Sequence, residues 1–317
     1  MAENERPDPK AAAPAAPTKK NPRAAPVPAG TPPAGGVKIE KGPAPAPTRA
    51  TPPPAGALPN NSHPVASAGL LPTARTPMKT SFADLTILLY GSPKIGKSTF
   101  ASRFPGALFL PTEPGLNHLE VFQAPADGSG IRSWTQFREI LTEVARGGHP
   151  FRTLVLDTAD NAYKLCSEWI CGTYGVKHLD DLPSKKGYAL ANAEFERVVR
   201  KAAQLPYGLV LVSHAQEREF RDKGSGLKHD RTVTTLTGGC HRIVAGLSDM
   251  VLFATVVADT SDDGKAISYR RVLMTKPNLA YDAGDRTGTL PREIPLDYDA
   301  FASAYAEGLA RKQDGTS

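Results

Sequence analysis

The chain has 317 residues, with 38 Lys and Arg against 32 Asp and Glu, which gives a net charge of +6. Its three cysteines, Cys166, Cys171 and Cys240, fit no disulfide framework or zinc spacing, and no apolar run is long enough to span a membrane. The composition therefore excludes a disulfide-stapled secreted domain and a membrane protein, and it predicts a soluble cytoplasmic protein.

The first 80 residues differ in composition from the rest of the chain. They contain 19 of the 30 prolines, and Phe82 is the first Phe, Tyr or Trp. Such a segment cannot bury enough apolar surface to offset its ordering entropy. We therefore expect residues 1–80 to be a disordered Pro/Ala-rich tail and residues 81–317 to form one domain. Ten basic and four acidic residues precede residue 81, so the tail carries the whole net charge and the rest has 28 residues of each sign. The tail is interpreted as a solvated spacer rather than a nucleic-acid-binding segment.

The segment Leu85–Thr99 predicts a phosphate-binding loop. Its apolar start predicts a buried strand, and the residues that follow fit the pattern G-x-x-x-x-G-K-[ST] at every fixed position. In this pattern backbone N–H groups bind phosphate, Lys97 reaches the β- and γ-phosphates, and Ser98 ligates Mg²⁺. ATP and Mg²⁺ are therefore the predicted cofactors. The predicted nucleotide-binding residues of the loop are Gly91, Ser92, Pro93, Lys94, Ile95, Gly96, Lys97, Ser98 and Thr99.

Downstream of the loop, buried-strand patterns alternate with helical patterns. Strands are predicted at 107–110, 153–157, 208–212, 250–257 and 267–275, the last two around a hairpin turn signal at 259–264. Helices are predicted at 98–104, 159–174, 188–204, 241–247 and 301–312, and a capping box at Ser133–Gln136 opens a further one. This alternation predicts an α/β fold with a mostly parallel sheet, helices on both of its faces, and a C-terminal β-hairpin.

Acidic residues follow two of the predicted strands, at the sheet edge where open α/β folds bind ligands. Asp157 ends an apolar run, as expected of the acid that holds Mg²⁺ in phosphate-loop enzymes. The next residue is Thr158, where AAA+ proteins usually have a glutamate. Glu113 follows the second strand and could activate the attacking water. A surface glutamate in a Pro-Gly turn is an equally weighted alternative.

Three segments resemble the RecA family: Phe109–Leu116 (FLPTEPGL), Ser213–Gln216 (SHAQ) and Arg271–Asn278 (RVLMTKPN). From Phe82 to Asp297 the layout is similar to the compact RecA-like ATPases of tailed phages. These are usually labelled AAA-domain or ATP-binding proteins, and one branch, the RecA-like Sak group, acts in single-strand annealing. The resemblance implies a RecA-like P-loop core located in the host cytoplasm, with Glu113 and Lys97 catalytic. It also implies that Lys276 acts on the ATP of a neighbouring subunit. The γ-phosphate sensor would be Ser213, His214 or Gln216.

The segment 217–235 is predicted to be a polar, glycine-containing loop. In RecA-like folds the loop at this place tracks single-stranded DNA, and Phe220 could stack on a base. Acidic residues dilute its charge, so a merely solvated loop is the alternative. The candidate DNA-binding residues are Arg218, Arg221, Lys223, Lys228 and Arg231.

The resemblance thus implies an oligomeric, Mg²⁺-dependent ATPase that acts on single-stranded DNA in phage-type recombination or annealing. The expected partners are single-stranded DNA, further copies of the chain in a ring or filament, and a single-stranded-DNA-binding protein. A non-hydrolysing, ATP-switched binding module is the first alternative. A P-loop kinase is less favoured, because the sequence shows no Arg-rich lid or acceptor pocket.

Overall fold

The computed structural model describes residues 74–76, 78–221, 224, 226–236, 238–260 and 267–315. All of these residues belong to one compact unit. The expected disordered tail lies outside the described residues except for 74–76 and 78–80, and so does the expected hairpin turn beyond Thr260.

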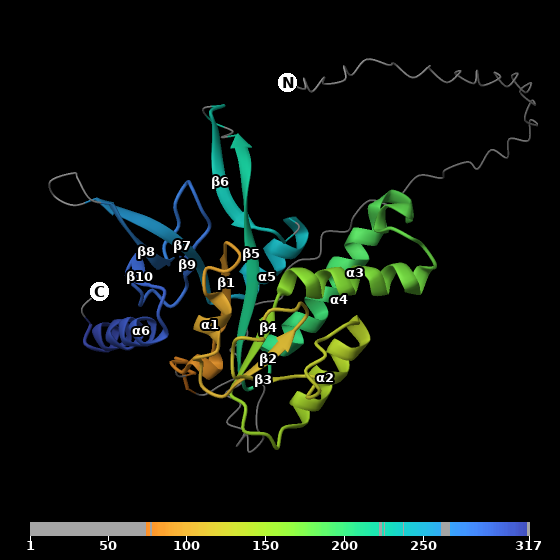
Figure 1. Ribbon diagram of the computed structural model, residues 1–317, viewed down its shortest axis with the longest axis horizontal. Coiled ribbons are helices and arrows are strands. Elements are labelled where there is room, and N and C mark those ends of the chain that lie inside the picture. Colours follow the sequence, from red (N-terminus) through yellow and green to blue (C-terminus); the bar gives the residue numbers. More distant parts are fainter. Residues whose placement is uncertain are drawn as a thin grey trace, which may run out of the picture. The chain divides into compact units, whose positions relative to one another are not determined.

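A mostly parallel sheet forms the centre of the domain (Figure 1), as predicted. Its strand order is β10-β8-β7-β1-β5-β4-β2-β3, with β6 paired to β5 and β9 paired to β7. Pairing is parallel from β3 across to β7 and antiparallel from β7 through β8 to β10, so the predicted C-terminal hairpin is confirmed. The bounds are β1 Thr86–Gly91, β2 Ala107–Pro111, β3 Phe122–Gln123, β4 Thr153–Asp157, β5 Gly208–Arg221, β6 Lys228–Thr234, β7 Met250–Thr260, β8 Ile267–Met274, β9 Gly284–Asp285 and β10 Glu293–Pro295.

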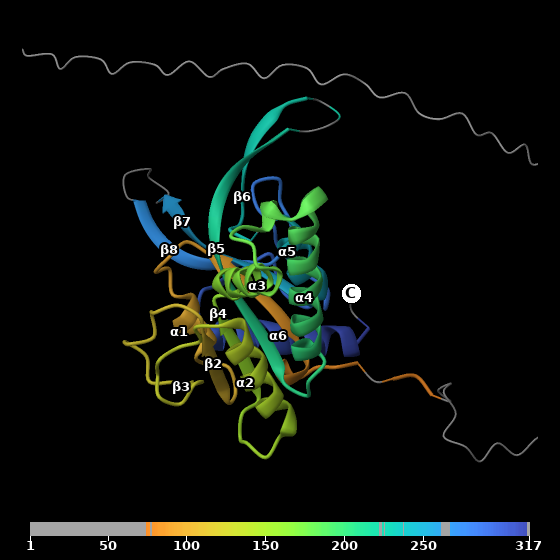
Figure 2. The ribbon, with the colours of Figure 1, turned by 90° about the vertical axis from the view of Figure 1, so that its right-hand side faces the viewer.

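Helices cover both faces of this sheet (Figures 1 and 2) because alternate residues of each buried strand point in opposite directions. Leu88 packs in one apolar cluster with α2, α3, α4 and α5, whereas Ile87 and Leu89 pack in another with α1 and α6. The bounds are α1 Lys97–Ala101, α2 Trp134–Arg146, α3 Ala159–Tyr174, α4 Lys186–Ala203, α5 Gly238–Leu247 and α6 Tyr298–Gln313, with short 3-10 helices η1 Phe82–Asp84, η2 Leu179–Asp181 and η3 Pro183–Lys185. Within the described residues, no helix has the length and apolar character to cross a membrane. All three cysteines are free, and Cys166 and Cys240 are buried.

The helices lie close to where the sequence predicts them, with small differences in their first and last residues. Helix α3 has the predicted bounds, and the Ser133 side chain caps α2 by accepting a hydrogen bond from the Gln136 N–H. The other half of the capping box is absent, because the Gln136 side chain accepts from the N–H of Arg132 instead. The helix after the phosphate loop is shorter than predicted and ends at Ala101.

The prediction of a loop at 217–235 is wrong. Strand β5 continues past Val212 to Arg221 and pairs antiparallel with β6, from Ala215 opposite Thr234 to Arg221 opposite Lys228. This two-stranded ribbon projects from the sheet (Figure 1). Its sequence alternates charged and polar residues with few apolar ones, so the usual strand signal, a buried apolar face, is missing.

Two helical glycines give a matched test of this packing. A Cβ at Gly308 of α6 would lie 2.1 Å from the Thr289 carbonyl oxygen, whereas a Cβ at Gly172 of α3 would meet nothing within 4 Å. Gly308→Ala is expected to lower the free energy of unfolding by about 1–3 kcal/mol through overpacking. Gly172→Ala should raise it by up to about 1 kcal/mol, because alanine favours the helix. Urea unfolding measures both changes. Equal destabilisation of the two variants would show that the space around these glycines does not decide the effect.

Candidate nucleotide-binding site

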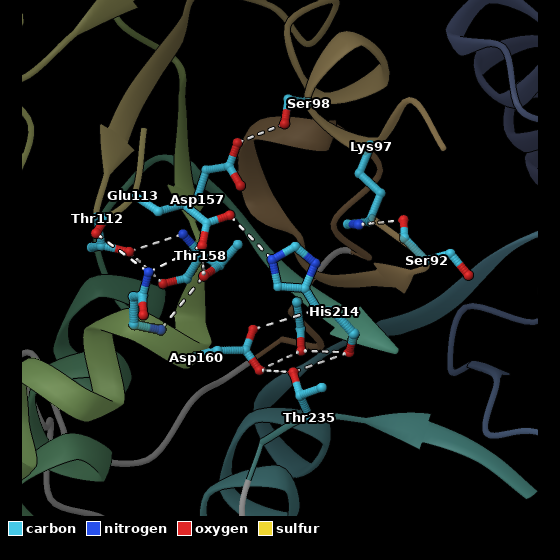
Figure 3. A network of polar contacts seen from close by, with 12 residues as sticks. Ser92, Lys97, Ser98, Thr112, Glu113, Asp157, Thr158, Asp160, His214 and Thr235 are labelled. Atoms are coloured by element: carbon cyan, nitrogen blue, oxygen red, sulfur yellow. Dashed lines mark hydrogen bonds and ion pairs between the residues drawn. The ribbon is translucent and has the colours of Figure 1, made fainter. Parts of the chain in front are cut away.

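The phosphate loop runs from the buried end of β1 to the start of α1, as the sequence predicts. Gly96 has a φ of 115°, in the left-handed region that favours glycine. Gly91 is required for a different reason, because a Cβ there would lie 2.3 Å from the carbonyl oxygen of Ala254 on β7. The Lys97 ammonium is buried and donates hydrogen bonds of 2.9 Å to the carbonyls of Gly91 and Ser92, and Figure 3 shows the one to Ser92. Lys97 thus lies at the base of the loop, facing its own backbone.

Asp157 ends β4, which is separated by one strand from β1, the strand that leads into the phosphate loop. Because β5 lies between β1 and β4, the ends of all three strands face the same space. The Ser98 hydroxyl donates a 2.7 Å hydrogen bond to Asp157 (Figure 3), which brings the two predicted Mg²⁺ ligands into contact. A hydroxyl and one carboxylate suit Mg²⁺, which takes its remaining ligands from nucleotide phosphates and water. Within the described residues, no group of three His, Cys, Asp or Glu side chains forms a separate metal site.

Burial shifts the pKa of both charged groups beside the loop. Desolvation raises the pKa of Asp157, while the hydrogen bond from Ser98 acts in the opposite direction. Desolvation lowers the pKa of Lys97, and Asp157 is the strongest of the acids that raise it. A bound anion and a bound cation would each stabilise the charged form of the neighbouring group, so the pocket is electrostatically suited to a metal–phosphate ligand.

Glu113 is half-buried and lines the same cleft as the phosphate loop. Its position is set by Thr112, whose hydroxyl donates to the Thr158 carbonyl at 2.8 Å and accepts from the Thr158 N–H at 2.9 Å, tying the ends of β2 and β4 together. One Glu113 oxygen lies 3.1 Å from His214 Nε2, and the other accepts a 3.0 Å hydrogen bond from Asn161 (Figure 3). This geometry favours the catalytic interpretation of Glu113 over a surface turn.

Thr158, which stands where AAA+ proteins usually carry a glutamate, has a structural role. It is the N-cap of α3, and its side chain accepts from the Asn161 N–H. Asp160 lies in the first turn of the same helix, and its side chain accepts several hydrogen bonds. Its carboxylate accepts a 3.1 Å hydrogen bond from the Ser213 hydroxyl, one of 3.3 Å from the His214 N–H, and another from Thr235 (Figure 3).

The structure separates the three candidate γ-phosphate sensors. Ser213 is fully buried and bonded to Asp160, and Gln216 donates to the Thr234 carbonyl at 2.9 Å. Only His214 of the three lines the cleft at the phosphate loop. Its Nδ1 atom is buried and has no hydrogen-bond partner among the described residues. His214 is therefore the member of this group best placed to contact a bound nucleotide.

A cleft of about 590 Å³ collects these side chains, a volume typical of small-molecule sites. Sequence reasoning missed four of its lining residues: Pro114, Gly115, His118 and Arg271. Strand parity is the signal that could have found Arg271, since it lies two positions from the buried Leu273 and so on the same face of β8. The predicted residues that line the cleft are Pro93, Lys94, Gly96, Lys97, Ser98, Thr99, Glu113, Asp157 and His214.

Lys276 lies away from its own phosphate loop. It follows β8, which runs antiparallel to β7 and β1, so the chain beyond Met274 runs away from the phosphate-loop end of β1 and toward the start of β7. Its ammonium is 3.4 Å from the fully buried carboxylate of Asp285. A contact between Lys276 and a nucleotide would have to involve another copy of the chain, and this role stays a prediction.

Four of the five candidate DNA-binding residues lie on the β5–β6 ribbon rather than on a flexible loop. Arg218, Arg221 and Lys228 are exposed, whereas Lys223 lies outside the described residues. Arg231 is half-buried and forms an ion pair with Asp282. DNA contact by these residues stays a prediction.

A parallel sheet with β1 at its centre, a glycine-rich phosphate loop, an opposed carboxylate and a polar cluster at the strand ends together define a P-loop nucleotide-binding protein. Residues 83–287 match the AAA-domain family, and the chain belongs to that family. AAA domains bind ATP, typically with Mg²⁺, and the family is one of ATPases. The chain is also 25% identical over 138 residues to the SPbeta prophage-derived uncharacterized protein YorG of Bacillus subtilis (strain 168). That match covers 41% of this chain and 41% of the relative, so the chain spans about two fifths of that protein.

Proposed function

We propose that this protein is a Mg²⁺-dependent ATPase that acts on single-stranded DNA. One observation carries the ATPase assignment: Glu113 and His214 line the same cleft as Lys97, Ser98 and Asp157. Lys97 would neutralise phosphate charge, and Ser98 and Asp157 would hold Mg²⁺. Glu113 would accept a proton from the attacking water, with His214 and Asn161 fixing its carboxylate. The direct test is ATP turnover with and without single-stranded DNA.

The distribution of side chains on the β5–β6 ribbon supports the choice of DNA as the partner. Successive side chains of a strand point to opposite faces, so the two faces of the ribbon carry different residues. Arg218, Phe220 and His229 share one face, where the Phe220 and His229 rings stack at 6.3 Å. The Arg231 guanidinium lies 5.8 Å from the centre of the same Phe220 ring. The acids Glu217, Glu219 and Asp230 lie on the opposite face, where Lys228 pairs with Glu219 at 2.9 Å. One face is thus basic and aromatic, the combination that binds single strands.

The difference between the two faces gives a prediction, and the basic residues of the opposite face provide its control. Arg218→Ala with Phe220→Ala should weaken single-stranded DNA binding by about 10-fold or more, since a stacked base contributes about 1–3 kcal/mol. The log–log salt dependence should fall by about 0.7, because Arg218 would no longer neutralise a phosphate. Arg221→Ala with Lys228→Ala removes more charge from the opposite face and should weaken binding less. Fluorescence anisotropy at several salt concentrations measures both variants.

A deletion of the N-terminal tail tests whether single-stranded DNA binds to the ribbon. Deleting residues 1–76 removes most of the basic tail and should change DNA affinity less than the Arg218 and Phe220 pair does. If the deletion abolishes binding and the ribbon variants do not, DNA binds to the tail and the ribbon has another role.

We propose phage-type recombination or single-strand annealing as the setting. The resemblance to RecA-like phage ATPases supports it, and so does the match to a prophage-derived protein. In such an assembly the chain would form a ring or filament, work alongside a single-stranded-DNA-binding protein, and present Lys276 to the nucleotide of the next copy. The position of Lys276, remote from its own loop, is compatible with that arrangement. Light scattering with and without ATP measures the assembly.

A non-hydrolysing, ATP-switched binding module is the second candidate. The observation in its favour is that both carboxylate oxygens of Glu113 already have partners, His214 and Asn161. A water molecule would have to compete with these groups for the carboxylate. ATP binding without turnover, in the presence and absence of DNA, would establish this alternative in place of the ATPase.

A further inference from the structure

Arg271 is an unassigned cation at the phosphate loop, contributed by a strand far away in the sequence. Its Nη1 donates a 3.1 Å hydrogen bond to the Ile95 carbonyl, and the side chain lines the nucleotide cleft. A Cβ at Gly96 would lie 3.1 Å from the same nitrogen. The glycine therefore provides both the left-handed turn of the loop and the space that the guanidinium occupies.

The strand that carries Arg271 is fixed to the same sheet as the loop. Strand β7 pairs directly with β1, and β8 pairs with β7, with Arg271 opposite Val256. Arg271 and the buried Leu273 share the face of β8 that packs toward α1. The arginine thus reaches the phosphate loop of its own chain through two strand pairings.

Most of the donor capacity of Arg271 is unused. A guanidinium has five N–H donors, and within the described residues the Arg271 side chain makes one hydrogen bond and no ion pair. Lys97, by contrast, already donates to two loop carbonyls. The geometry of the fork suits bidentate binding of phosphate oxygens, which a lysine cannot reproduce.

The preceding residue provides a matched control. Arg270 points to the opposite face of β8, where its guanidinium forms ion pairs with Asp259 and Glu293. It has the same side chain, lies on the same strand and is exposed, yet it does not line the cleft. Comparing the two arginines therefore isolates the effect of the cleft from the effect of net charge.

We propose that Arg271 binds the phosphates of the nucleotide held by its own chain, as a second cation beside Lys97. This inference rests on the proposed function and adds a residue to the same site. The assignment differs from that of Lys276, which would serve a neighbouring copy. The roles of Arg271 and Lys276 are therefore separable by experiment.

The first experiment measures equilibrium binding of Mg-ATP by calorimetry. Arg271→Ala should weaken binding by about 10- to 100-fold, the range expected when a charge-assisted hydrogen bond is removed. Arg271→Lys should be intermediate, because it keeps the charge and loses the fork, and Arg270→Ala should bind as the wild type does. If Arg271→Ala binds like the wild type while Lys97→Ala does not bind, the role of Arg271 is overturned and the site assignment stands. If Lys97→Ala also binds normally, the proposed function fails as well.

The second experiment separates action within one chain from action between chains. In a mixture of Lys97→Ala and Arg271→Ala, every site lacks one of the two cations if both come from the same chain, so ATP turnover should stay at the level of the separate variants. Restored turnover would show that Arg271 serves a neighbour, and it would overturn the proposal. A mixture of Lys97→Ala and Lys276→Ala should recover part of the activity, because some interfaces pair an intact Lys97 with an intact neighbouring Lys276.

Discussion

Replacing Lys97 by alanine is expected to weaken ATP binding by about 100-fold or more and to abolish turnover, because the main phosphate-neutralising charge of the loop is removed. The fold should survive. Within the described residues, the hydrogen bonds of the Lys97 ammonium go to carbonyls of its own loop, Gly91 and Ser92, and no apolar cluster includes Lys97. Calorimetry measures the affinity, and the melting temperature checks the fold.

Two further measurements sharpen the Lys97 prediction. Lys201→Ala, which removes an exposed lysine from α4, should leave affinity unchanged. Burial lowers the pKa of Lys97, and only the protonated form attracts phosphate. Wild-type affinity should therefore fall as pH rises through that lowered pKa, and the Lys97→Ala variant should lose this component of the pH dependence. Unchanged turnover by Lys97→Ala would remove the phosphate-loop assignment altogether.

Glu113→Gln is expected to slow hydrolysis by about 10²- to 10⁴-fold while ATP and Mg²⁺ still bind. The amide has the shape of the carboxylate and can keep hydrogen bonds to His214 and Asn161, which lie 3.1 and 3.0 Å from the two oxygens. It cannot accept the proton of the attacking water. Single-turnover hydrolysis with saturating ATP isolates the chemical step from binding.

Glu139→Gln is the matched control for this change, because Glu139 is exposed on α2 and does not line the cleft. It should hydrolyse ATP at the wild-type rate. A Glu113→Gln variant with normal hydrolysis would return Glu113 to the alternative of a surface glutamate in a Pro-Gly turn. Another group would then have to activate the water.

Local patterns in the sequence determined the phosphate loop and most of the elements around it. Gly91, Gly96 and Lys97 stand at fixed spacing between an apolar run and a helix, so strand, loop and helix could be located without knowing the rest of the fold. The bounds of β4 and α3 matched because apolar run length and helical periodicity are both local signals. Asp157 could be assigned from its place at the end of such a run.

Only the tertiary structure decided how these parts meet. Strand order places β5 between β1 and β4, which brings the end of the apolar part of β5 beside Glu113 and the phosphate loop, where His214 lines the cleft and Ser213 and Gln216 do not. Antiparallel pairing turned a predicted loop into the β5–β6 ribbon, and it brought Arg271 to a carbonyl 176 positions earlier in the chain. Pairing register and strand order depend on packing between segments distant in sequence. Local periodicity in the sequence does not contain that information, because the apolar pattern of a strand is the same whichever neighbouring strand it pairs with.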